Sequence, residues 1–131
     1  MQRILIILYT VSITLFAHAQ QVKSKKIQPD STSFENIYVT KIAEDELQST
    51  FVIWIKKEVK PHYHAHHTEY VQVLSGKGTM VLNKDTFKIK KGDSMVIPKG
   101  SIHSVRTTSR KPLKVVSVQA PKYDGDRIWI D

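Results

Sequence analysis

Residues 70–106 read YVQVLSGKGTMVLNKDTFKIKKGDSMVIPKGSIHSVR, and this stretch sets the fold class that we expect. Short runs rich in β-branched and aromatic residues alternate in it with breaks of glycine, proline, asparagine and aspartate. Runs of this kind are typical of β-strands, and from Phe34 onward no segment shows the 3.6-residue apolar period of a helix. The stretch therefore predicts an all-β protein.

The same pattern extends outward in both directions. Eight strand-like runs result, at Ile37–Ile42, Phe51–Ile55, Tyr70–Leu74, Thr79–Leu82, Thr86–Ile89, Ser94–Ile97, Ile102–Arg106 and Leu113–Val118. Lys60-Pro61 is interpreted as a break, and Ala43–Leu47 as the one possible helical turn. After a turn-rich segment, Ile128–Ile130 is expected to dock on a sheet or on a partner. Many short strands at nearly regular spacing indicate a β-sandwich or barrel.

Length and composition limit the function classes. The chain has 131 residues, enough for one domain, and no cysteine, which excludes disulfides and thiolate chemistry. The net charge is +8, but the basic residues are spread along the chain. This favours a solvated basic surface over a nucleic-acid site, and a small molecule is the expected partner.

The N-terminus has the three parts of a secretory signal peptide. Arg3 is followed by an apolar stretch, Ile4–Phe16, and then by Ala17-His18-Ala19, with small residues at the positions that a signal peptidase recognises. Thirteen apolar residues are too few to span a bilayer, which takes about twenty. We expect residues 1–19 to be cleaved, leaving a periplasmic or secreted protein without a membrane anchor. We expect residues 20–33 to form a flexible N-terminal segment, either a tether or an arm lying over the domain, and residues 34–131 to form the single domain.

Histidines are concentrated in one segment of the expected mature chain. In a strand, His62 and His64 point to the same side, Glu69 follows after a turn, and His103 lies near a later strand. Imidazole and carboxylate ligands without sulfur suit one divalent transition metal from the group Fe, Mn, Ni, Cu, Co and Zn. An octahedral ion held by these four residues keeps two positions open for water or substrate.

Two motifs in this region resemble those of the cupin superfamily. His62-Tyr63-His64, then Glu69 and Gly76, is similar to the first motif, and residues 92–103 (GDSMVIPKGSIH) are similar to the second. The resemblance implies a double-stranded β-helix, the jelly-roll barrel, with His62, His64, Glu69 and His103 as metal ligands. Two positions depart from the family pattern, Lys56 and Thr107, and neither is a ligand.

Two alternatives stay open at this point. His64 and His66 also form a His-x-His pair, but only two residues then separate the pair from Glu69, so His66 and His67 are assigned to a loop. The resemblance implies either a metal-dependent enzyme, of dioxygenase, isomerase or lyase type, acting on a small polar molecule such as a sugar acid or phenolic, or a non-catalytic binding or sensing module. It also implies a possible homodimer.

Overall fold

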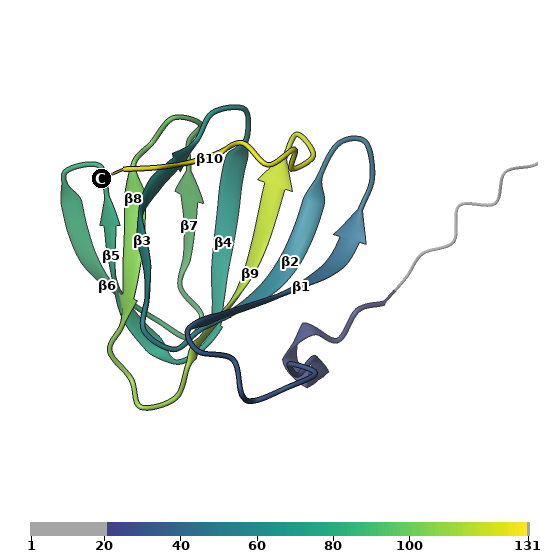
Figure 1. The fold of residues 1–131 in the computed structure, drawn as a ribbon, viewed down its shortest axis with the longest axis vertical. Coiled ribbons are helices and arrows are strands. Elements are labelled where there is room, and N and C mark those ends of the chain that lie inside the picture. Colours follow the sequence, from purple (N-terminus) through teal and green to yellow (C-terminus); the bar gives the residue numbers. More distant parts are fainter. Residues whose placement is uncertain (1–20, 131) are drawn as a thin grey trace, which may run out of the picture.

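The computed structural model describes residues 21–130, and within them ten strands form two antiparallel sheets (Figure 1). The chain begins with a short 3-10 helix, η1 (Ser24–Lys26). The strands are β1 (Ile37–Glu44), β2 (Ser49–Ile55), β3 (Glu58–His64), β4 (Thr68–Ser75), β5 (Lys77–Leu82), β6 (Asp85–Lys90), β7 (Ser94–Ile97), β8 (His103–Thr107), β9 (Leu113–Ala120) and β10 (Arg127–Trp129). No helix among the described residues is long and apolar enough to cross a membrane.

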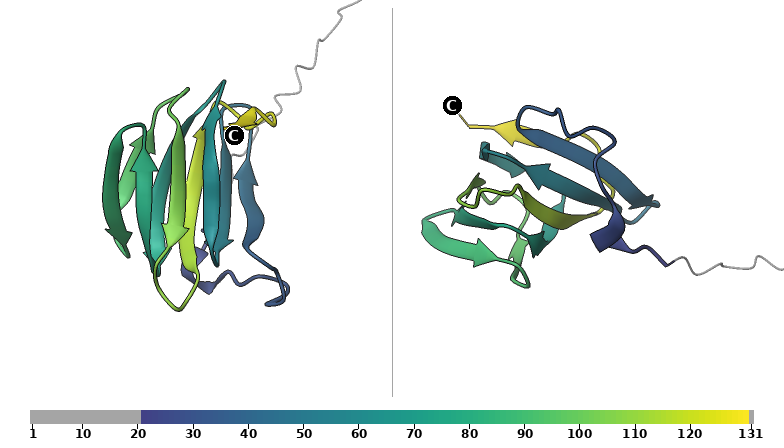
Figure 2. Two further views of the ribbon diagram at one scale, coloured as in Figure 1. Left: turned by 60° about the vertical axis from the view of Figure 1, so that its left-hand side comes forward. Right: turned by 90° about the horizontal axis from the view of Figure 1, so that it is seen from below.

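Each sheet combines strands that are distant in the sequence. One sheet has the order β1-β2-β9-β4-β7, and the other has the order β10-β3-β8-β5-β6. The two sheets lie over one another as the two layers of a jelly-roll barrel, as Figure 2 shows from two further directions. The expected all-β jelly-roll fold is therefore confirmed.

The core lies between the sheets because inward positions along the strands are apolar at two-residue intervals. Its buried residues come from both sheets: Ile55, Val73, Met80, Ile89, Ile97, Leu113 and Val115. In β9 the alternation continues past the apolar residues, so that Ser117 and Gln119 are buried on the same inward side. The barrel thus has an apolar body and a polar end.

Two expectations about local structure need correction. The helical turn at Ala43–Leu47 is wrong, because β1 extends to Glu44 and a hairpin bend follows, in which Asp45 Oδ1 accepts the N–H groups of Leu47 and Gln48. The break at Lys60-Pro61 is also wrong. Pro61 lies inside β3, where the pairing with β8 shifts register, and a β-bulge tolerates the missing N–H of proline.

The N-terminal and C-terminal segments both contact the barrel. The Lys114 ammonium group donates to the backbone carbonyls of Ser24 (3.0 Å) and Ile27 (2.7 Å), which holds η1 against the sheet. At the other end of the chain, β10 pairs with β3. The tail therefore docks on a sheet, which is one of the two outcomes expected for Ile128–Ile130. The expected signal peptide, residues 1–19, lies outside the described residues.

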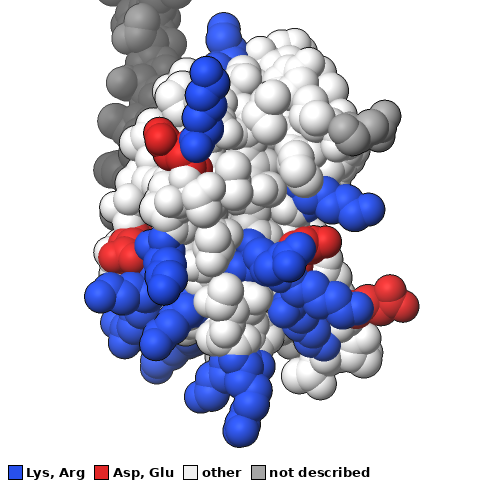
Figure 3. All heavy atoms as spheres, turned by 90° about the vertical axis from the view of Figure 1, so that its left-hand side faces the viewer, with Lys and Arg blue, Asp and Glu red and all other residues white. Residues whose placement is uncertain are grey.

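Basic side chains gather on one face of the barrel, over the edge formed by β5 and β6 (Figure 3). Lysines that line shallow grooves there include Lys77, Lys88 and Lys90. Strand β6 is the edge of its sheet, and lysines on an edge strand discourage pairing with another chain.

Candidate metal centre

The four predicted ligands converge between the two sheets at one end of the barrel. His62 and His64 occupy alternate positions at the end of β3, and His62 pairs directly with His103 at the start of β8. Glu69 lies near the start of β4 in the opposite sheet. All four side chains are buried, each with at most 6% of its residue surface exposed.

The three histidines form one group that could hold a small cation, and Glu69 lies beside two of them. The Nε2 atoms of His64 and His103 each lie 3.5 Å from Glu69 Oε2, and ring nitrogens of the three histidines lie within 4.8 Å of one another. Two ligand atoms bound to one ion at about 2.1 Å are separated by roughly 3.0–3.4 Å. His64 Nε2 is enclosed and has no hydrogen-bond partner among residues 21–130, a deficit that a bound metal would relieve.

Contacts on the far side of each ring orient the histidines. His62 Nδ1 lies 2.8 Å from the Lys60 carbonyl, and His103 Nδ1 lies 3.0 Å from the Ser101 carbonyl. A carbonyl oxygen only accepts, so in each neutral ring Nδ1 carries the proton and Nε2 keeps its lone pair. Metal-binding histidines are usually fixed in this way.

The surroundings of His62 and Glu69 lower the pKa of both side chains, which favours the deprotonated forms that bind a cation. Burial, followed by the charges of His103 and Arg127, lowers the pKa of His62 to about 4, so this ring is neutral at neutral pH. Burial alone would raise the pKa of Glu69. The neighbouring His103 and His64 rings and a hydrogen bond from the Ser117 hydroxyl outweigh burial and hold that pKa well below its usual range.

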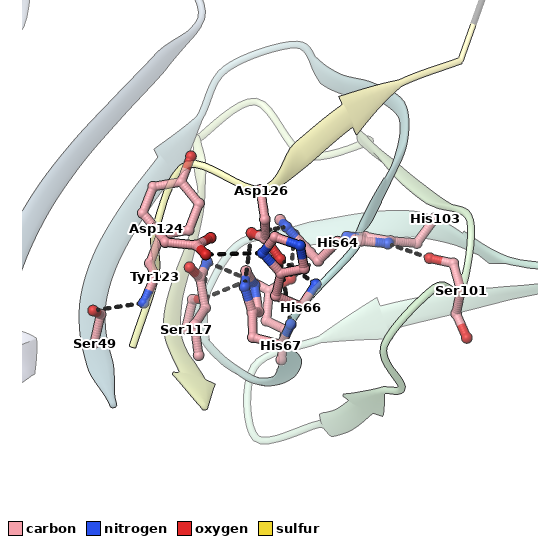
Figure 4. Close-up of polar contacts among 12 residues, drawn as sticks. Ser49, His64, His66, His67, Ser101, His103, Ser117, Tyr123, Asp124 and Asp126 are labelled. Atoms are coloured by element: carbon pink, nitrogen blue, oxygen red, sulfur yellow. Dashed lines mark hydrogen bonds and ion pairs between the residues drawn. The ribbon is translucent and has the colours of Figure 1, made fainter. Parts of the chain in front are cut away.

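Asp126, which sequence reasoning missed, lies behind the His64 ring (Figure 4). Its Oδ1 lies 3.6 Å from His64 Nδ1 and 2.9 Å from His67 Nδ1, while Oδ2 accepts the His66 and His67 N–H groups. Burial opposes ionisation of Asp126, but the His66 N–H and the neighbouring His67 and His64 lower its pKa overall. Asp126 thus places a negative charge behind the His64 ring, at ion-pair distance but without a hydrogen bond to it.

Within residues 21–130, the two histidines outside the ligand set, His66 and His67, differ in burial. Both lie in the loop between β3 and β4, as expected. His66 is exposed and its Nδ1 lies 2.8 Å from Asp124 Oδ2. His67 is only 1% exposed and its ring centre lies 4.1 Å from that of His64, so it belongs to the buried layer around the site. Burial, and then the nearby His64, lowers the pKa of His67.

A cavity of about 80 Å³ adjoins the cluster and is lined in part by His62, Glu69 and His103. Since one water molecule needs roughly 10–15 Å³ of cavity volume, there is room for a small ligand. Besides those three residues, Ser104 and Arg127 are the polar members of the lining, and every other lining residue is apolar.

Sequence reasoning missed four residues near the site. Two of them could have been found from the strand pattern in the sequence, and the other two could not. Ser117 and Gln119 are polar residues at inward positions of β9, a pattern that is visible in the sequence once the strand is assigned. Asp126 and Arg127 carried no such signal, because their place depends on how the tail folds back onto β3.

Known proteins share both the sequence pattern and the fold. A family profile described as a cupin domain matches residues 50–119. An uncharacterised protein of Aquifex aeolicus is 41% identical over 93 residues, which span 71% of this chain and 76% of that protein.

Two solved structures illustrate the likeness of fold. A conserved Klebsiella pneumoniae protein with a double-stranded β-helix domain superposes with a TM-score of 0.72, at 18% identity, over 87% of this chain and 99% of the other. The Streptomyces nucleoside dehydratase Pac13 superposes with a TM-score of 0.65, at 16% identity, over 74% and 82% of the two chains. With the profile match covering more than half of its residues, this chain belongs to the cupin family.

Proposed function

We propose that this chain is an exported cupin that binds one divalent transition metal through His62, His64, Glu69 and His103 and uses it to act on a small polar molecule. The observation that carries the proposal is the shared orientation of the rings. The Nδ1 atoms of His62 and His103 face backbone carbonyls, and the Nε2 atoms of His64 and His103 lie at equal distances from a buried carboxylate oxygen.

The cavity beside the ligands supports a reacting site over a purely structural ion. Structural metal sites are closed by protein ligands, whereas catalytic sites keep a position open. Three of the four ligands line a cavity, and its apolar wall would exclude water from a bound molecule. A divalent ion supplies Lewis acidity there, and a redox-active ion also supports reactions with oxygen. The Lys60 and Ser101 carbonyls then keep the His62 and His103 rings in position.

Catalysis is tested by comparing metals. The iron, manganese, nickel and zinc forms are incubated with uronates, other sugar acids and small phenolics, and products are followed by mass spectrometry. We expect conversion of at least one compound. An isomerase or lyase should work with several ions, whereas a dioxygenase should need a redox-active ion and be inactive with zinc. Arg106→Gln, at an exposed ion pair with Glu58, is the control that should leave conversion unchanged.

The result that would contradict catalysis is binding without conversion. Saturable binding of a compound by every metal form, with complete recovery of the unaltered compound, contradicts catalysis and supports the binding or sensing module.

Export is a separate part of the proposal, supported by Arg3, the apolar stretch Ile4–Phe16 and Ala17-His18-Ala19. Intact-mass analysis of the expressed protein should find a chain that begins at Gln20. Ala19→Trp should block cleavage, because the peptidase accepts only small residues there, and His18→Trp should not. Recovery of the unmodified protein as a chain that still begins at Met1 would refute export.

A further inference from the structure

Arg127 brings a positive charge to the wall of the cavity beside the metal ligands. It is the first residue of β10, which crosses the upper end of the barrel in Figure 1. Arg127 pairs with His64 across the two strands and lines the same cavity as His62 and Glu69. Arg127 therefore borders the same cavity as three of the four predicted metal ligands.

Among residues 21–130, the guanidinium group of Arg127 has no anionic partner. Its Nε is enclosed without a hydrogen-bond partner, and it forms no salt bridge with any carboxylate of residues 21–130. Its charge rests instead against the Trp129 ring, with Cζ 5.4 Å from the ring centre. By contrast, Arg106 is exposed and paired with Glu58 at 3.3 Å. Arg127 is half-buried, and an anion that enters the cavity would give its enclosed Nε the hydrogen-bond partner that it lacks.

The charge balance of the cavity also favours an anion. Glu69 is the only carboxylate in its lining, so Arg127 and a divalent ion together leave a net charge of +2. A planar guanidinium matches an oxyanion in a bidentate pair. The rest of the lining offers one hydroxyl, from Ser104, and otherwise apolar side chains such as Met80, Met95 and Val105. Several hydroxyl groups or a multiply charged phosphate would lack partners there.

We propose that Arg127 binds the carboxylate of the substrate, and that the substrate is a small monocarboxylate with an apolar body. This rests on the proposed function, because it assigns a substrate class to the same site. In place of sugar acids and phenolics, it favours aliphatic or aromatic carboxylates, which are polar at the carboxylate and apolar elsewhere.

The test compares carboxylates with their uncharged amides. Binding of isovalerate and isovaleramide, benzoate and benzamide, and glucuronate and glucuronamide is measured by calorimetry on the metal-loaded protein, whose metal content is determined in parallel. Isovalerate or benzoate should bind at least tenfold more tightly than its amide. Arg127→Met should weaken that carboxylate by about 10–100-fold and leave the amide unchanged, because it removes a charge-assisted bidentate pair. Arg127→Lys should retain part of the preference, and Arg106→Gln should retain all of it.

The outcomes separate this inference from the metal proposal. Absence of metal in the wild-type protein contradicts the proposed function. With one metal per chain, the inference is overturned if Arg127→Met binds the carboxylate within twofold of wild type, if glucuronate is the preferred ligand, or if neither isovalerate nor benzoate binds. A purely structural role for Arg127 would lower the unfolding temperature in Arg127→Met without changing the ratio of carboxylate to amide affinity.

Discussion

Replacing His64 with alanine should reduce metal affinity by more than 100-fold. His64 is 2% exposed, its Nε2 lies 3.5 Å from Glu69 Oε2, and its Nδ1 lies 3.6 Å from Asp126 Oδ1. Loss of a residue that only supports a ligand commonly costs about 10–100-fold, and removal of the ligand itself should cost more. A competition titration against a chelator, with metal content measured by elemental analysis, gives the affinity.

His66→Ala is the matched control for this prediction, because His66 belongs to the same loop region but is exposed and paired with Asp124. It should bind metal like the wild-type protein, whereas His62→Ala should behave like His64→Ala. The assignment of ligands is refuted if His66→Ala abolishes binding while His62→Ala preserves it.

Gly76→Ala should destabilise the barrel by roughly 2–5 kcal/mol. Gly76 joins β4 to β5 with φ at +82°, a left-handed conformation that costs other residues about 1–2 kcal/mol. A Cβ atom there would also lie 2.7 Å from the Pro112 carbonyl oxygen and 2.8 Å from Leu113 Cα. Both neighbours are backbone atoms, so relief requires movement of the chain before β9, and overpacking of this kind costs about 1–3 kcal/mol.

Gly92→Ala separates the two contributions. Gly92 also has a positive φ, +95°, but an added Cβ meets no atom within 4 Å. Its loss should be only the conformational part, about 1–2 kcal/mol. Urea unfolding of both variants in the same metal state provides the comparison, and equal losses would show that close packing against Pro112 and Leu113 has no role.

Sequence reasoning predicted the strands that are encoded by residues close together in the chain. The run Ser94–Ile97 coincides with β7, and Leu113–Val118 lies within β9, because alternating apolar residues bounded by turn residues determine such strands. It missed β3 because Pro61 normally ends a strand, and only the pairing of β3 with β8 reveals the bulge that accommodates it.

The part of the site that could be predicted is the part encoded in the spacing of the two sequence motifs. His62, His64, Glu69 and His103 were identified from the two motifs, and the structure brings their side chains together. The burial of His67 and the positions of Asp126 and Arg127 depend on contacts across about 60 residues of chain, between the β3–β4 loop and the tail. Periodicity and spacing carry no information about such long-range contacts.

Anomalous X-ray diffraction from crystals of the metal-loaded protein, collected at the absorption edge of the metal found by elemental analysis, tests the metal centre most directly. We expect one strong peak, about 2.0–2.3 Å from the Nε2 atoms of His62, His64 and His103 and from the Glu69 carboxylate. The absence of a peak there, or a single peak at the more exposed group of His66, Asp124 and Asp126, would contradict the account.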